Sequence, residues 1–166
     1  MSSDHSLKQK ASHIRLLVLD VDGTLTDGGV YIDSNGIQSK KFNIKDGMGI
    51  TQLREKGIHV GMISHSRSKS ILDERARMLG IELMYSGKEA KLQVMDRWLK
   101  ELGLSYENVA YIGDDINDLE VIDKAGLSAC PHDAHFSVVK EVDVVLQRNG
   151  GDGCVREFID RFLLPL

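Results

Sequence analysis

The sequence has few cysteines, and they form none of the patterns found in metal sites or disulfide frameworks. Of its 166 residues only Cys130 and Cys154 are cysteines, and they form no C-x-x-C pair. Zinc modules and small secreted domains depend on such patterns. The sequence therefore argues against both, and we expect two small apolar thiols in a reducing compartment.

Long apolar runs and blocks of like charge are also missing. The first apolar run, residues 14–19, is far shorter than a signal-peptide core or a membrane span. We therefore expect a cytoplasmic protein with no membrane partner. The 21 Lys and Arg are interspersed with 25 Asp and Glu, for a net charge of −4. This balance disfavours nucleic acid as a partner and favours a small molecule.

Proline is scarce, and no repeat or Gly/Pro-rich linker divides the chain. The two prolines, Pro131 and Pro165, both lie late in the sequence. Because a domain averages about 150 residues, the length has room for one. We predict a disordered N-terminal tail over residues 1–12 and a single domain over 13–166.

The hydrophobic pattern predicts an α/β fold. Short apolar runs alternate with segments of helical period, two of which end at Gly80 and Gly103, residues typical of helix C-termini. This alternation predicts a Rossmann-like parallel sheet with helices on both faces, and ligands then bind beyond the carboxyl ends of the strands. The predicted strands cover residues 14–19, 58–63, 81–85, 109–112, 127–129 and 142–146.

One segment interrupts the alternation directly after the first strand. Two β-prone stretches, residues 30–32 and 37–42, flank the turn signal Ser34-Asn35-Gly36. An Asn-Gly pair between such stretches predicts a β-hairpin.

Acidic residues gather where two of the predicted strands end. Asp20 and Asp22 lie two residues apart, so their side chains point the same way, and Gly23 permits a sharp turn. Two carboxylates at the mouth of an apolar sheet repel each other unless a cation lies between them, and a hard divalent ion suits oxygen ligands. A second cluster, with Asp114, Asp115 and Asp118, follows the strand at 109–112.

Each cluster has an ordinary explanation when taken alone. An Asp-Gly pair is turn chemistry, and Asp115 or Asn117 after a strand could equally cap a helix. Two clusters at one edge of the same sheet are much harder to explain by chance, because that edge is where ligands bind.

Two further residues complete an ordered set. Ser64 follows the second strand, and Lys91 follows the third. The set Asp20-Val21-Asp22-Gly23-Thr24, Ser64, Lys91 and Gly113-Asp114-Asp115-x-x-Asp118 resembles the four motifs of haloacid dehalogenase-like phosphatases. The order carries the resemblance, since Lys91 alone would more often be a solvated helix residue.

Further segments are similar to one group within that family. Residues 27–31, 41–43, 46–50 and the tail 150–157 resemble 3-deoxy-D-manno-octulosonate 8-phosphate (KDO 8-phosphate) phosphatases and their sialic-acid-type relatives. The resemblance implies a Mg²⁺-dependent sugar phosphatase that releases KDO and phosphate through an aspartyl-phosphate, in lipopolysaccharide precursor synthesis.

The same resemblance implies a role for each matching residue. Asp20 would be the nucleophile and Asp22 the general acid and base. Asp20, the backbone carbonyl of Asp22, and Asp114 would hold Mg²⁺, while Ser64 and Lys91 would bind the phosphoryl oxygens. Further expected roles are less direct: Asp115 and Asp118 would orient metal-bound water or Lys91, and Arg156 of the tail would contact the substrate.

The sequence departs from the family pattern at the end of the second predicted strand. KDO 8-phosphate phosphatases commonly have Thr or Ser, then Gly-Arg, at this point, with the arginine facing the sugar acid, whereas this chain has Ser64-His65-Ser66. Arg67 is offset by one residue, and His65 is the only histidine for which we expect a possible role. A nine-carbon ulosonate 9-phosphate is therefore an alternative substrate. A non-catalytic oligomerisation module, as in sialic acid cytidylyltransferases, is an alternative of another class.

The length leaves no room for the cap domain that shields the site in most relatives. The hairpin at residues 28–43 is too small to cover its own site but could cover that of a neighbour. Since the phosphorylated intermediate needs a dry site, we expect a homotetramer in which each hairpin covers a neighbouring active site, as the family precedent implies.

Overall fold

The protein is an α/β domain built on one parallel sheet. The computed structural model describes residues 2–66 and 68–164. Six strands lie in the order β5-β4-β1-β6-β7-β8, with every neighbouring pair parallel. Their bounds are Leu16–Asp20 for β1, His59–Ser64 for β4, Leu83–Ser86 for β5, Val109–Ile112 for β6, Leu127–Cys130 for β7 and Val144–Val145 for β8. The predicted parallel sheet is confirmed.

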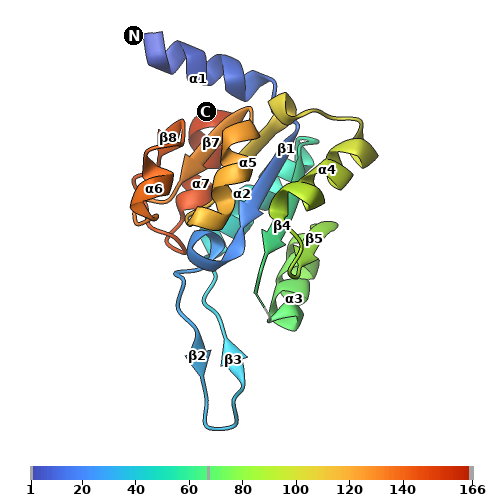
Figure 1. Ribbon diagram of the computed structural model, residues 1–166, viewed down its shortest axis with the longest axis vertical. Coiled ribbons are helices and arrows are strands. Elements are labelled where there is room, and N and C mark those ends of the chain that lie inside the picture. The colour runs from blue at the N-terminus through green and yellow to red at the C-terminus, as the bar shows by residue number, and fades with distance from the viewer. Residues whose placement is uncertain (1, 67, 165–166) are drawn as a thin grey trace.

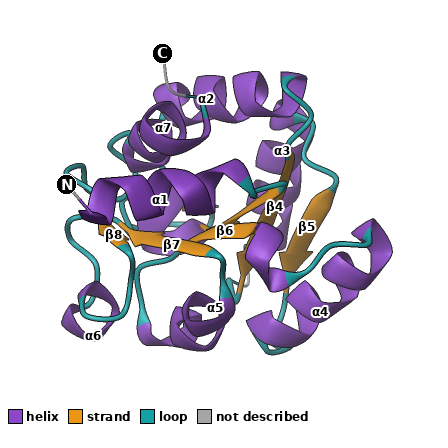
Figure 2. Ribbon diagram, turned by 90° about the horizontal axis from the view of Figure 1, so that it is seen from above, coloured by secondary structure: helices purple, strands orange, loops and turns teal. Residues whose placement is uncertain are grey.

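Helices cover both faces of this sheet. Figure 2 shows α1 (Ser2–Ser12), α2 (Ile44–Glu55), α3 (Lys69–Leu79) and α7 (Cys154–Phe158) on one face. The other face carries α4 (Lys91–Leu102), α5 (Leu119–Lys124) and α6 (Phe136–Val139). Gly80 and Gly103 end α3 and α4 in the left-handed conformation, with φ of 63° and 67°, as the sequence predicts.

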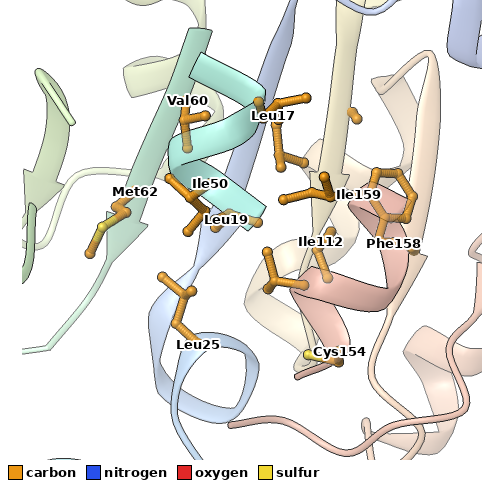
Figure 3. Close-up of a cluster of buried hydrophobic side chains, with 14 of the residues drawn as sticks. Leu17, Leu19, Leu25, Ile50, Val60, Met62, Ile112, Cys154, Phe158 and Ile159 are labelled. Carbon is orange, nitrogen blue, oxygen red and sulfur yellow. The ribbon is translucent and has the colours of Figure 1, made fainter. Parts of the chain in front are cut away.

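Alternation along β1 divides the buried side chains into two cores. Leu17 and Leu19 pack with α2, α3 and α7, whereas Leu16 and Val18 pack with α4 and α5. Figure 3 shows the first core, in which Ile50 of α2 lies beside Leu19 of β1 and Phe158 of α7 belongs to the same cluster. Because all five residues of β1 are buried, the strand holds its carboxyl end rigidly at the centre of the sheet.

The predicted hairpin is present and projects from the body of the domain (Figure 1). Strands β2 (Tyr31–Ile32) and β3 (Gln38–Ser39) pair antiparallel across the Asn35-Gly36 turn, where Gly36 has a φ of 77°. An isolated bridge between Thr26 and Phe42 closes the base of the hairpin.

The N-terminal segment corrects one expectation. Residues 1–12 were expected to be a disordered tail, but residues 2–12 form helix α1. Leu7 and Ala11 of this helix pack against the first core, and Lys10 donates to Asp143 at 2.5 Å. Leu7 and Ala11 lie four residues apart on one helical face, a pattern too short and too polar to stand out in the sequence. Within the described residues, no helix has the length and apolarity that spanning a bilayer requires.

Candidate active site

The carboxyl ends of β1, β4 and β6 converge on a cavity of about 260 Å³. Five of the site residues predicted from the sequence line it, and the remaining lining residues come from the loops after β4 and β6. The full set is Asp20, Asp22, Ser64, His65, Ser66, Asp114, Asp115 and Asn117.

The turn after β1 brings the two acidic clusters into contact. Asp20 is the last residue of β1, and Gly23 follows in a tight turn with a φ of 94°. A Cβ atom on Gly23 would lie 2.0 Å from Oδ2 of Asp114, so only glycine allows Asp114 to approach the turn so closely. Thr24 Oγ1 also faces Oδ1 of Asp114, at 3.4 Å.

Lys91 is a buried cation that lies against two carboxylates of the site. It is the first residue of α4 and only 2% exposed. Its Nζ atom donates to Oδ1 of Asp20 and, at 2.6 Å, to Oδ1 of Asp118. A buried ammonium between two carboxylates neutralises charge that the apolar sheet could not tolerate alone.

Asp118 organises the loop after β6. It is fully buried and accepts hydrogen bonds from Tyr111 Oη at 2.5 Å and from the backbone amides of Asp114 at 3.0 Å and Asp115 at 3.2 Å. With Lys91 as a fourth donor, both carboxylate oxygens of Asp118 are engaged. Asp118 therefore holds Lys91 and the loop in place.

Burial and crowding of negative charge perturb the titration of this cluster. Burial raises the pKa of Asp20 well above its usual range, and Asp118 and Asp114 add to the effect against the opposing pull of Lys91. Burial, with the nearby Asp118 carboxylate, also raises the pKa of Asp114 to about 6. For Lys91 burial alone would lower the pKa, but the carboxylates of Asp20 and Asp118 outweigh it and the pKa is raised.

A metal ion could be held by this cluster. Oxygens of Asp20, Asp114 and Asp118 lie within 4.8 Å of one another. Since Asp118 is already engaged by Lys91, Tyr111 and two amides, Asp20 and Asp114 are the better placed ligands. Hard cations such as Mg²⁺ prefer carboxylate oxygens of this kind.

Ser64 and Asp22 face each other across the cavity. Ser64 is 2% exposed, and its Oγ atom accepts a hydrogen bond from the Ser66 amide at 2.9 Å. The same Oγ atom lies 3.5 Å from Oδ2 of Asp22. The other oxygen of Asp22, Oδ1, accepts from Lys40, which lies on the returning arm of the hairpin.

Lys40 is a site residue that our sequence reasoning missed. Its side chain is only 3% exposed, although a lysine in a polar hairpin reads as solvated surface. The Asn-Gly turn was the available signal. A hairpin folded at that turn carries its returning arm back beside the chain that leaves Asp22, as the bridge between Thr26 and Phe42 shows.

The loop residues after β4 and β6 join at the rim of the cavity. His65 contacts the Glu89 carbonyl through Nε2 at 3.0 Å and Asn117 through Nδ1 at 3.4 Å. Asp115 lines the cavity and also caps the following turn, since its Oδ1 accepts from the Ile116 amide at 2.7 Å. The position of Asp115 therefore fits both hypotheses, that it caps the turn and that it belongs to the site.

Arg156 is not brought to the cavity within this chain. It lies in α7, and its Nε donates to Asp160 at 2.7 and 2.8 Å. Its Cδ would lie 2.9 Å from a Cβ on Gly49, so its stem packs against α2. Arg67, the other arginine considered for the sugar acid, lies outside the described residues.

The glycine-rich tail packs behind the turn that follows β1. Gly151 donates from its amide to the Thr24 carbonyl at 3.0 Å, and a Cβ on Gly150 would lie 1.9 Å from the Gly23 carbonyl oxygen. The sequence predicts a contact between this tail and the substrate, through Arg156. In the structure the tail supports the turn that carries Asp22.

Comparison with known proteins gives the family. A family model for haloacid dehalogenase-like hydrolases matches residues 43–126. The chain is 43% identical over 155 residues to 3-deoxy-D-manno-octulosonate 8-phosphate phosphatase of Escherichia coli K12, covering 93% of this chain and 82% of that protein.

Solved structures agree with this match. The Yersinia pestis phosphatase of the same name has a TM-score of 0.92 at 41% identity, over 96% of this chain and 85% of that one. The Moraxella catarrhalis phosphatase, solved with a magnesium ion, a phosphate ion and a KDO molecule, has a TM-score of 0.92 at 34% identity, over 96% and 91%. The chain is therefore a hydrolase of the haloacid dehalogenase-like family and belongs, within it, to the 3-deoxy-D-manno-octulosonate 8-phosphate phosphatases.

Proposed function

We propose that this chain hydrolyses 3-deoxy-D-manno-octulosonate 8-phosphate to KDO and phosphate, and that it serves lipopolysaccharide precursor synthesis. The observation that carries the proposal is the convergence of Asp20, Asp22, Ser64, Lys91 and Asp114 at one edge of the sheet. The named relatives, which match over most of the chain, support the same substrate.

Asp20 is the proposed nucleophile. One of its carboxylate oxygens attacks phosphorus, the new O–P bond forms, and the bond between phosphorus and the sugar oxygen breaks. Its place at the end of a fully buried strand fixes the attacking oxygen, so little orientation is lost on the way to the transition state.

Asp22 is the proposed general acid and base. A sugar alkoxide is a poor leaving group, so Asp22 gives it a proton, and then takes a proton from the water that attacks the aspartyl-phosphate. That water releases phosphate and restores Asp20. Asp22 lines the cavity, and its Oδ2 lies 3.5 Å from the Ser64 hydroxyl, which supports this role.

Ser64 and Lys91 are the proposed phosphoryl ligands. The Ser64 hydroxyl is fixed by the Ser66 amide, and the raised pKa of Lys91 keeps its ammonium charged at neutral pH. Donors fixed in advance stabilise the charge on the equatorial oxygens without reorganisation. Asp118 positions Lys91, and Asp115 remains a candidate for orienting water.

The residues present fit a magnesium ion, and the Moraxella catarrhalis phosphatase was solved with one. Asp20 and Asp114 have raised pKa values because they are buried beside like charge, which is the state that a bound divalent cation relieves. We propose that these two carboxylates and the backbone carbonyl of Asp22 hold Mg²⁺. The ion would supply charge neutralisation between the carboxylate and a phosphoryl oxygen.

A substrate panel tests the choice of sugar. The chain has His65 and Ser66 where relatives of this kind commonly have Gly-Arg, so nine-carbon ulosonate 9-phosphates are the competing substrates. Phosphate release should be measured with Mg²⁺ on eight-carbon and nine-carbon acids side by side, with hexose phosphates as controls. We expect the highest kcat/KM on the eight-carbon acid, and a preference for the nine-carbon acids would overturn that assignment.

The same substrate panel distinguishes an enzyme from a non-catalytic oligomerisation module. An oligomerisation module has no need of a buried lysine between two carboxylates, which is costly unless it serves chemistry. The intact set therefore supports an enzyme. A purified protein that releases phosphate from no member of the panel would favour the module.

We further propose a cytoplasmic homotetramer in which hairpin 28–43 covers a neighbouring active site. The hairpin extends from the body and exposes apolar side chains, with Tyr31 at 58%, Ile32 at 64% and Ile37 at 63% exposure. Such side chains gather where a partner covers them. Light scattering should give a tetramer, and a fully active monomer would remove this proposal.

A further inference from the structure

Lys40 is buried beside the residue to which we assign proton transfer, and neither the sequence motifs nor the proposed mechanism gives it a role. Its Nζ atom contacts Oδ1 of Asp22, and its side chain is 3% exposed while that of Asp22 is 34% exposed. The neighbouring Lys41 is 58% exposed and pairs with Asp27 at 3.3 Å. Of these two adjacent lysines, only Lys40 reaches into the site.

The returning arm of the hairpin is fixed on both sides of Lys40. Gln38 of β3 accepts a hydrogen bond from Ser68 Oγ at 2.6 Å, two residues before Lys40. Phe42, two residues after it, bridges to Thr26 and stacks under Arg75 at 5.2 Å. Lys40 is thus held from both sides, and the ammonium is directed at Asp22 by backbone and neighbours.

We propose that Lys40 is a positioning residue for the proton transfer carried out by Asp22, an inference that rests on the phosphatase function proposed above. The ammonium occupies Oδ1, which leaves Oδ2, the oxygen facing Ser64 and the cavity, to exchange the proton with the leaving sugar oxygen. Without Lys40 the Asp22 side chain, which is partly exposed, is free to rotate and to turn either oxygen away.

The same contact ties proton transfer to the hairpin. Since Lys40 lies on the hairpin and Asp22 on the turn after β1, a change in the position of the returning arm moves the ammonium and with it the carboxylate. The hairpin in this account orients the acid of its own chain, in addition to any cover that it gives a neighbour.

Leaving-group dependence separates positioning from a merely structural role. Lys40→Met keeps the length of the stem and removes the charge. General acid catalysis contributes about 10²–10⁴-fold, so a misplaced Asp22 should lower kcat on the sugar phosphate by at least about 10-fold. p-Nitrophenolate is a much weaker base than a sugar alkoxide and leaves without a proton, so kcat on p-nitrophenyl phosphate should fall by less than about 3-fold.

The experiment compares both substrates in one preparation with Mg²⁺ present. The ratio of the two kcat values does not depend on the folded fraction, so a poorly folding variant still gives an answer. Lys69→Met is the matched control, since Lys69 pairs with Asp73 on the surface of α3 and should leave the ratio unchanged. Lys40→Cys treated with 2-bromoethylamine restores an ammonium of nearly the same length and should recover the ratio, whereas Cys130 and Cys154 are buried.

Each outcome has one meaning. A selective, rescued loss on the sugar phosphate supports the inference. Equal losses on both substrates, or no loss on either, would overturn it while the phosphatase function stands. Wild-type protein that releases phosphate from neither substrate would overturn the proposed function, and this inference with it.

Discussion

Asp46 is a buried carboxylate whose replacement by asparagine should stabilise the folded protein at neutral pH. It lies in the first turn of α2 and is fully buried. Its Oδ1 accepts from the Arg156 amide at 2.7 Å, and so joins α2 to the start of α7. Its Oδ2 has no hydrogen-bond partner among the described residues.

The size of the effect follows from the pKa. Burial raises the pKa of Asp46 from 3.8 to about 6, against the opposing hydrogen bond from Arg156 and the charge of Arg75. A raised carboxyl pKa means that the stability due to the protonated form is fully present below about pH 3.8 and is lost as the pH rises through 6. At 1.36 kcal/mol per pKa unit, the charged form costs about 3 kcal/mol at pH 7.5.

Asparagine reproduces the neutral carboxyl group without the proton. Its Oδ1 can still accept from the Arg156 amide, and its amide group takes the place of the unpartnered oxygen. Asp46→Asn should therefore raise the free energy of unfolding by about 2–3 kcal/mol at pH 7.5. The gain should shrink to about 1 kcal/mol at pH 4.5, where the wild-type carboxyl group is already protonated in the folded state.

Urea denaturation at the two pH values, with EDTA present throughout, measures both numbers. Asp73→Asn, which alters a carboxylate in a surface ion pair, is the control and should change stability by less than about 1 kcal/mol. A variant less stable than the wild type at pH 7.5 would contradict this prediction. It would show that the charge of Arg75 stabilises the ionised Asp46 by more than burial destabilises it.

Two further changes probe the site itself. Lys91→Met leaves the Asp20 and Asp118 carboxylates buried without their ammonium, so it should lower the free energy of unfolding by about 3–5 kcal/mol in EDTA. Mg²⁺ should raise the melting temperature of the variant more than that of the wild type. Thermal unfolding with and without Mg²⁺ measures both effects, and an unchanged melting temperature of the variant in EDTA would contradict the prediction. Gly23→Ala places a Cβ 2.0 Å from Oδ2 of Asp114, at a position where the backbone φ is 94°, so kcat should fall at least about 100-fold. Near-normal turnover of the variant would contradict this and would show that the turn can relax.

The sheet and the acidic clusters could be predicted from the sequence because buried parallel strands produce apolar runs and ligand sites follow their carboxyl ends. The run at residues 109–112 coincides with β6, and Asp114 follows it into the cavity. Lys91 could be placed only through the order of the motifs, because nothing in its local pattern shows that it is 2% exposed.

The remaining features depend on contacts between distant segments. Lys40 reaches Asp22 only because the returning arm is fixed by Gln38 and Phe42, and no local periodicity encodes that approach. Arg156 lies in a motif-like tail, yet pairing with Asp160 one helical turn later keeps its guanidinium away from the cavity of this chain. Tertiary packing decides both cases.

The most direct test of the account is phosphate release from 3-deoxy-D-manno-octulosonate 8-phosphate by the wild-type protein and by Asp20→Asn, each with Mg²⁺. Asn keeps the shape of Asp20 but cannot form the aspartyl-phosphate. We predict rapid release by the wild type and none above background by the variant. Comparable release by the two proteins would contradict the assignment of Asp20 as nucleophile, and with it the mechanism built on the end of β1.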